Sequence, residues 1–246
     1  MIAARVGAVA IPAYLALLLL VDRSVGATGQ LVLGAITWAA LAVVCARVSP
    51  LRRAQALVVV LVATCAEVTG SIVWGVYTYR LENLPSFVPP AHGLVYLGGL
   101  TLAASLRRHE RLLVGTVLLA VVTWGVAGVT VLPRADVGGA LGAMLLAAFL
   151  LRGRAPATYA GVFLVVAALE LYGTALGTWT WAETIPGTGV PNGNPPSGVA
   201  SGYVWFDVVA LAAAPRVVAL TGLARGVRGR SRATPASPLQ ETARSA

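Results

Sequence analysis

Two glutamates lie inside long apolar stretches of this chain, and each begins the same ordered set of residues. The first copy reads Glu67-x-x-Gly70, Gly75-x-Tyr77-x-Tyr79, and the second reads Glu170-x-x-Gly173, Gly177-x-Trp179-x-Trp181. Both copies continue into a proline-rich segment and then into another apolar stretch. A carboxyl group surrounded by hydrocarbon is costly, so its default interpretation is functional. The repeated order also predicts an internal repeat.

The surroundings of the two glutamates indicate uncharged acids. The chain contains no lysine, and no arginine lies in the apolar stretches that hold Glu67 and Glu170. Without a counter-ion in a low dielectric, a carboxyl group is expected to be protonated near neutral pH. Such a group can act as a general acid or relay a proton. The alternative is structural, namely a protonated glutamate hydrogen-bonded between two helices.

Further polar residues follow each copy. His92 and Tyr96 are spaced i, i+4 and would share a helix face, and Tyr203 and Asp207 repeat this spacing. The predicted catalytic residues are Glu67, Glu170, Asp207 and His92, and the predicted substrate-binding residues are Tyr77, Tyr96, Trp74, Tyr203 and Trp181. The alternatives are a plain interfacial role for His92 and, for the paired tyrosines and tryptophans, an aromatic belt at the membrane surface.

The elements that position these residues follow from composition. The chain is 58% hydrophobic and 11% charged, with a mean hydropathy of +0.82. Several apolar runs approach the roughly 20 residues that cross a bilayer, so we predict an all-α polytopic membrane helix bundle. The eight expected spans cover residues 6–22, 30–48, 55–79, 92–106, 112–132, 137–151, 156–181 and 198–223.

Continuous helices would set the depth of the glutamates. Because the expected spans 55–79 and 156–181 include the aromatic pairs, Glu67 and Glu170 should lie about 16–18 Å below these pairs, near the membrane midplane. Gly173-x-x-x-Gly177 would then be a small-residue face for a neighbouring helix.

The arginines predict the orientation of the bundle. All 18 basic residues are arginines, and fifteen fall on one side of the expected spans. Only Arg23, Arg80 and Arg134 fall on the other side. Because cytoplasmic loops carry the excess of positive charge, both termini should be cytoplasmic. The net charge of +9 thus reflects membrane topology, and the pattern does not indicate nucleic-acid binding.

The spacing of the copies predicts the organisation of the chain. Each half would hold four spans, and an even number preserves orientation, so we expect two parallel four-helix repeats, residues 1–106 and 107–224. An arginine-rich tail, 225–246, is expected to be disordered. The two histidines and two distant cysteines form no convincing metal site, and phosphate-binding and Gly-x-Ser-x-Gly motifs are absent. We therefore expect no metal and no cofactor.

One family resemblance arises at these residues. Glu67-Val-Thr-Gly70, followed by Gly75-Val-Tyr77-Thr-Tyr79 and a proline loop, resembles a short signature of bacterial carotenoid-hydratase-type membrane proteins. Those proteins add water across terminal isoprenoid double bonds. The resemblance implies a lipid-soluble substrate, and it touches these five named residues only.

These patterns favour an intramembrane acidic cavity between the two repeats. The leading hypothesis is a cofactor-free hydratase or isomerase that acts on an isoprenoid or lipid in a bacterial-type plasma (inner) membrane. The expected partner is a membrane lipid or hydrophobic small molecule. The alternatives are a small proton-coupled transporter or flippase and a non-enzymatic membrane scaffold. The sequence does not predict an oligomeric state.

Overall fold

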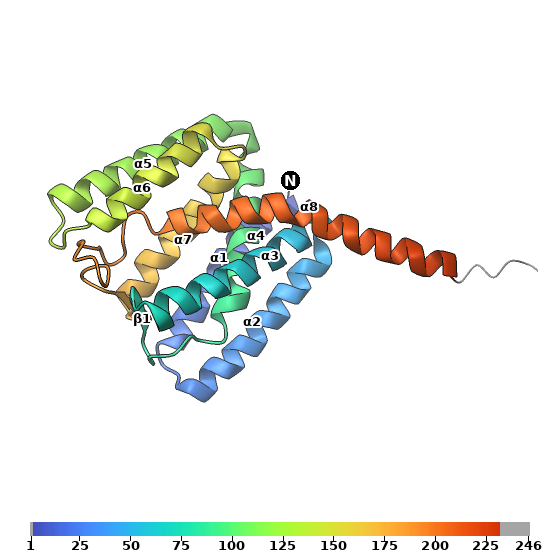
Figure 1. Cartoon of the computed structure of the whole chain (residues 1–246), viewed down its shortest axis with the longest axis horizontal. Coiled ribbons are helices and arrows are strands. Elements are labelled where there is room, and N and C mark those ends of the chain that lie inside the picture. Colours follow the sequence, from blue (N-terminus) through green and yellow to red (C-terminus); the bar gives the residue numbers. More distant parts are fainter. Residues whose placement is uncertain (1, 232–246) are drawn as a thin grey trace, which may run out of the picture.

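The computed structural model describes the backbone of residues 2–231 and the side chains of residues 6–222. Within these residues the prediction of an all-α fold with eight helices is confirmed (Figure 1). The helices are α1 (Ile2–Asp22), α2 (Ala27–Arg47), α3 (Pro50–Glu67), α4 (Val88–Ser105), α5 (Glu110–Thr130), α6 (Val137–Arg152), α7 (Pro156–Leu176) and α8 (Ala200–Ser231). The short elements are the π-helix η1 (Val68–Val73), the 3-10 helix η2 (Arg107–His109) and the strands β1 (Tyr77–Tyr79) and β2 (Trp179–Trp181).

The exterior of the bundle is apolar, as expected of a surface that faces lipid. Val9, Leu61 and Leu119 are each about two-thirds exposed, and many other large apolar side chains are also exposed. A helix bundle that is apolar both inside and outside is an integral membrane protein. Within the part of the chain that the structure describes, five helical segments are long and apolar enough to span a membrane, and these are Ala27–Arg47, Pro50–Val73, Arg107–Thr130, Pro156–Leu176 and Ala200–Gly222. The apolar helices Val6–Asp22 and Val137–Arg152 are shorter.

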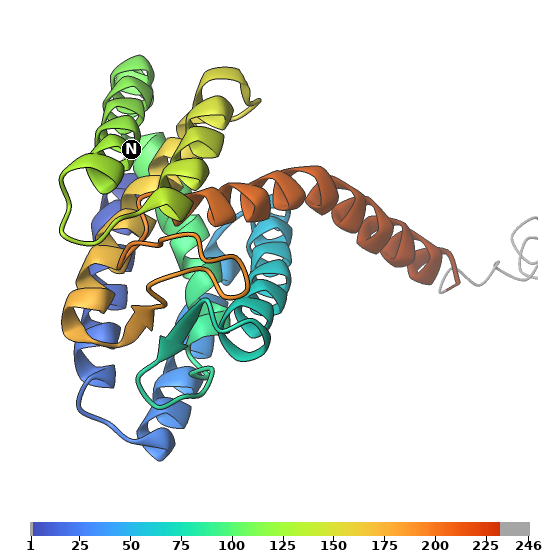
Figure 2. The ribbon, with the colours of Figure 1, turned by 60° about the vertical axis from the view of Figure 1, so that its left-hand side comes forward.

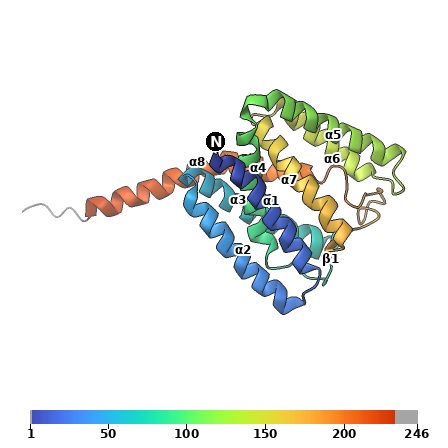
Figure 3. The ribbon, with the colours of Figure 1, turned by 180° about the vertical axis from the view of Figure 1, so that it is seen from behind.

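Helix α4 is the central helix of the bundle. Ten of its 18 residues are buried, and it packs against α1, α2, α3 and α7 (Figure 3). Gly99 lets α4 approach α7 closely, because a Cβ at this position would lie 2.6 Å from the Cα of Val162. A helix that is enclosed by protein faces little lipid, so α4 can carry the polar residues His92 and Tyr96.

Four connections meet at one end of the bundle, which we call the strand end. They comprise residues 23–26, 74–87, 131–136 and 177–199, and they lie on the side predicted to be poor in arginine. Arg80 donates a hydrogen bond to the carbonyl oxygen of Val25 at 2.6 Å, and Arg134 donates to that of Asn192 at 2.7 Å. Two of the three arginines on this side therefore hold the connections together. Figure 2 shows the ribbon at this end, where the arrows of β1 and β2 lie side by side.

Helices from the first half of the chain pack against helices from the second half. Helix α3 packs most extensively against α8, and α4 packs extensively against α7. In contrast, α1 packs on α4, whereas α5 packs chiefly on α6 and α7. Helix α8 extends past the rest of the bundle to Ser231, into the segment predicted to be disordered (Figure 1). The rest of that segment, 232–246, lies outside the described residues.

Two predicted spans end earlier than expected. The helical segment that begins with α3 ends at Val73 rather than at 79, and α7 ends at Leu176 rather than at 181. Gly75 and Gly177 adopt φ angles of +73° and +70°, a left-handed conformation that favours glycine and reverses the chain. The residues beyond each glycine form β1 and β2, which pair antiparallel with Thr78 opposite Thr180.

Candidate active site

Strand β1 folds back over the end of α3 and returns two tyrosines to the first glutamate. Side chains i and i+2 of a strand lie on one face, so Tyr77 and Tyr79 point in the same direction. Both hydroxyl groups donate hydrogen bonds to Oε2 of Glu67 at 2.7 Å. The predicted separation of about 16–18 Å between glutamate and aromatic pair is therefore wrong, because the chain reverses instead of continuing as a helix.

Strand β2 does the same for the second glutamate. The indole N–H groups of Trp179 and Trp181 donate to Oε2 of Glu170 at 2.9 Å and 3.2 Å. Glu67 and Glu170 each lie six residues before the end of their helical segment. Their position near the membrane midplane stays a prediction.

The glycine three residues after each glutamate leaves room for the first aromatic ring of the pair. A Cβ at Gly70 would lie 3.0 Å from Cε1 of Tyr77, and a Cβ at Gly173 would overlap the ring of Trp179. The Glu-x-x-Gly spacing is therefore explained by an aromatic ring that crosses the helix face. The predicted helix–helix role of Gly173 and Gly177 is not observed.

The first copy contains one residue more than the second between its glutamate and the glycine at the chain reversal. Helix η1 accommodates this residue, since a π-helical turn bonds i to i+5 and so contains one residue more than an α-helical turn. Its last bond runs from the N–H of Trp74 to the carbonyl oxygen of Thr69 at 2.8 Å. The two aromatic pairs consequently reach their glutamates in the same way.

His92 contacts the other oxygen of the first glutamate. Its Nδ1 lies 2.9 Å from the carbonyl oxygen of Val88, and because a carbonyl only accepts, Nδ1 carries a hydrogen. Its Nε2 lies 3.2 Å from Oε1 of Glu67. At this distance a proton can pass between the two atoms, although the contact does not have the geometry of a hydrogen bond. Glu67 and His92 therefore form a pair that is close enough to exchange a proton.

The second glutamate has a different environment. Glu170 is 7% exposed and forms no ion pair within the described side chains. When Tyr96 is aligned with Tyr203, Val199 takes the position of His92, and this valine lines the same cavity. The two glutamates thus have matching hydrogen-bond donors but differ in their ionisable neighbour.

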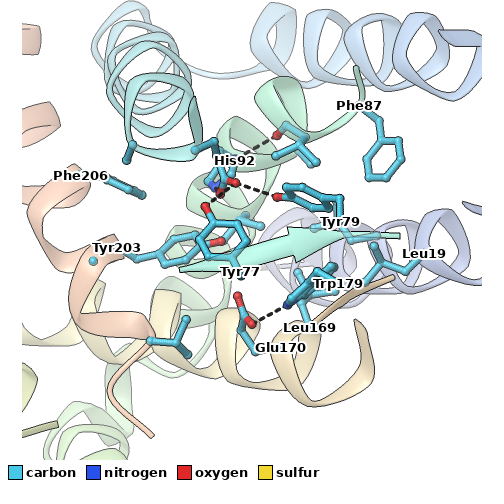
Figure 4. Close-up of a pocket in the computed structure, with 18 of the residues that line it drawn as sticks. Leu19, Tyr77, Tyr79, Phe87, His92, Leu169, Glu170, Trp179, Tyr203 and Phe206 are labelled. Atoms are coloured by element: carbon cyan, nitrogen blue, oxygen red, sulfur yellow. Dashed lines mark hydrogen bonds and ion pairs between the residues drawn. The ribbon is translucent and has the colours of Figure 1, made fainter. Parts of the chain in front are cut away.

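An apolar cavity of about 230 Å³ connects these groups. Six of the predicted site residues line it, namely Glu67, Glu170, His92, Tyr77, Tyr203 and Trp181. The ring of His92 stacks on that of Tyr203 with centroids 5.4 Å apart. Figure 4 shows the hydroxyl groups of Tyr77 and Tyr79 directed toward the region of His92, and Glu170 hydrogen-bonded to Trp179. Leu15, Leu18 and Leu19 of α1 complete one apolar wall.

Three predicted site residues do not line this cavity. Asp207 and Tyr96 are each 1% exposed and lie one helical turn further along α8 and α4 than Tyr203 and His92. Trp74 is half-exposed at the surface and donates to the carbonyl oxygen of Pro186 at 3.0 Å.

Four aromatic residues line the cavity that the sequence patterns did not assign to the site, namely Tyr79, Trp179, Phe87 and Phe206. A signal for the first two was present, because Tyr-Thr-Tyr and Trp-Thr-Trp combine strand-forming residues with period-two spacing. Reading these segments as strands would have placed both rings of each pair on one face. Phe87 and Phe206 carry no comparable local signal.

The tyrosine hydroxyls of β1 remain hydrogen-bond donors. Burial, together with the nearby Glu67 carboxylate, raises the pKa of both Tyr77 and Tyr79 above the usual value. These phenols therefore stay protonated and stabilise negative charge on Oε2 of Glu67.

Residues 6–222 contain no group of three His, Cys, Asp or Glu side chains placed to hold a metal ion. No protein-family model, curated protein or solved structure matches this chain.

Proposed function

We propose that the cavity binds an unsaturated isoprenoid or lipid and that the chain adds water to, or isomerises, one of its double bonds. One observation carries this proposal: Glu67 with His92 beside it, and Glu170 without an ion-pair partner among the described side chains, line a single apolar cavity with aromatic walls. Apolar walls select an apolar ligand, and a few converging polar groups supply the chemistry. The local resemblance to carotenoid-hydratase-type proteins favours the same substrate class.

Glu170 is the proposed general acid. It has no ion-pair partner among the described side chains, and burial without a counter-ion favours the neutral carboxyl group. The indole groups occupy only Oε2, so the proton is carried on Oε1. Transfer of that proton to an alkene carbon leaves a carbocation on the neighbouring carbon.

The aromatic rings around the cavity suit this intermediate. The faces of Trp, Tyr and Phe rings attract cations, by about 2 kcal/mol or more when the site is dry. Trp179, Trp181 and Phe206 supply such faces. Leucines of α1 would hold the remaining hydrocarbon chain.

The Glu67–His92 pair is the proposed base. In a hydration, a water oxygen bonds to the cation and a water proton passes to the pair, whereas in an isomerisation the pair removes a proton from the adjacent carbon. Either route leaves one extra proton on the pair and one missing from Glu170. The opposite charges then favour return of the proton to Glu170, so no other reactant is consumed.

The proposed membrane orientation follows from the charges and the inner packing. We infer two parallel repeats with their strand ends outside the cytoplasm and both termini inside it. The antiparallel pairing of equivalent segments at Thr78 and Thr180 supports a local two-fold axis between the halves. The arginine distribution supports the orientation.

Lipid extracts of cells that produce the wild-type chain or Glu170→Gln test the function. The glutamine keeps an oxygen for the indole donors but has no acidic proton, so we expect product to fall by at least about 100-fold while the protein remains folded. The product is a species heavier by one water, or an isomer with altered retention, measured by chromatography and mass spectrometry. Glu110→Gln, at an exposed site on α5, is the matched control and should leave the product unchanged.

A second function is favoured by one observation. Each glutamate accepts two hydrogen bonds that connect a strand to a helix, and such bonds can also serve a purely structural role. Unchanged lipids together with a lower melting temperature of Glu170→Gln would support this scaffold role and contradict catalysis.

A further inference from the structure

Asp207 and Tyr96 are two buried polar residues inside the bundle that do not line the cavity. Each residue is 1% exposed, and neither Oδ2 of Asp207 nor the hydroxyl of Tyr96 has a hydrogen-bond partner within the described residues. Tyr96 follows His92 by one turn of α4, and Asp207 follows Tyr203 by one turn of α8. The two residues therefore lie below the stacked His92–Tyr203 rings, on the side away from the strand end.

Such a pair of buried groups requires a hydrogen-bonding partner. A buried polar group without one costs about 1–3 kcal/mol, and more when it is a carboxyl group. Buried waters in proteins serve this purpose and typically make about three hydrogen bonds. A carboxyl group and a hydroxyl group can supply several of them.

We propose that Asp207 and Tyr96 bind an internal water molecule beneath the cavity. We further propose, and this part rests on the hydration proposed above, that the site supplies the water that the reaction consumes. The walls of the cavity are largely apolar and would not themselves retain water, whereas a polar site one turn away can. When this water attacks the cation, its oxygen forms the new C–O bond and its proton passes to the Glu67–His92 pair.

Radiolytic hydroxyl-radical footprinting of the full-length protein in detergent tests the water site. Bound water generates radicals where it lies, so residues beside it are oxidised even when they are buried. We expect oxidation of Tyr96, measured by mass spectrometry, to be several-fold faster than that of Phe163, an aromatic residue of the apolar core that is 3% exposed. Equal rates at the two residues in the wild-type protein would overturn the proposal.

Asp207→Leu provides the matched variant. Without the carboxyl group the water is lost, so Tyr96 should fall to the rate of Phe163 while Tyr79, on the cavity wall, keeps its rate. An unchanged rate at Tyr96 would overturn the assignment of Asp207. If this variant does not fold, the comparison within the wild-type protein still decides.

The two proposals fail separately. Rapid labelling of Tyr96 with no lipid effect of Glu170→Gln would retain the water site and reject its role as reactant. Slow labelling with a clear lipid effect would reject the water site and retain the acid/base chemistry.

Discussion

At the scale of single residues, the two glutamates have similar hydrogen-bonding surroundings but different ionisable neighbours. Glu67 and Glu170 both accept two hydrogen bonds from an aromatic pair, but only Glu67 has an imidazole beside it. The corresponding Val199 leaves Glu170 without a partner that could share its proton. Environments that differ in this way separate acid and base roles.

The glycines beside the glutamates make a prediction at this scale. Gly173→Ala places a methyl group into the ring of Trp179, so we expect a loss of about 1–3 kcal/mol in stability. Gly70→Ala should cost less, because its Cβ would lie 3.0 Å from Tyr77 and a smaller shift of that ring relieves the contact. Thermal unfolding in detergent measures both.

Gly115→Ala is the control for these variants. This glycine lies on exposed α5, and a Cβ added there would have no neighbour within 4 Å. The alanine should leave the melting temperature unchanged or raise it slightly, since alanine favours a helix. Equal losses at Gly115 and Gly173 would contradict the ring-crossing explanation.

At the scale of elements, the decisive feature is the return of two strands onto two helices. Segments about a hundred residues apart meet as β1 and β2, and Thr78 and Thr180, at the centre of the pairing, are exposed. Asp136 reinforces this region, because its carboxylate accepts hydrogen bonds from the backbone N–H groups of Gly193 and Ser197, each at 2.7 Å. The connections at the strand end thus act as one ordered cap.

The π-helix η1 gives a prediction for this scale. Deletion of Ile72, which is exposed, would convert η1 to an α-helical turn and give the first copy the spacing of the second. We expect the variant to keep its fold and most of its thermal stability. Ala175 is exposed in α7, and the second copy contains no extra residue between its glutamate and its reversal glycine. Deletion of Ala175 should therefore lower the melting temperature strongly. Similar losses of thermal stability in both deletion variants would show that η1 does not accommodate an extra residue.

At the scale of the whole molecule, one end is rich in arginine and the other is closed by the strands. The prediction is an orientation in the membrane, measured with single cysteines in a background lacking Cys45 and Cys65. Ser24 and Glu183 are exposed at the strand end, and a cysteine at either position (Ser24→Cys or Glu183→Cys) should react with a membrane-impermeant thiol reagent in intact cells. Arg108 and Arg154 are exposed at the opposite end, and a cysteine at either position (Arg108→Cys or Arg154→Cys) should react only after the membrane is broken. The reverse pattern would contradict the orientation inferred from the arginines.

The sequence alone determined the features that depend on local composition. Hydropathy located the eight helices, because lipid exposure requires apolar residues along the whole length of a segment. The cost of a buried carboxyl group identified Glu67 and Glu170 as candidate site residues. Helical spacing placed His92 and Tyr96 on one helix face. These signals add up along neighbouring residues and need no knowledge of the fold.

The tertiary structure decided how these residues meet. The reversals at Gly75 and Gly177 turned expected helix ends into strands, and each strand contacts the other strand and the glutamate of its own copy. The same packing brought Phe87 and Phe206 to the cavity and left Trp74 at the surface. Contacts between segments so far apart depend on the assembled bundle, so no local pattern in the chain specifies them.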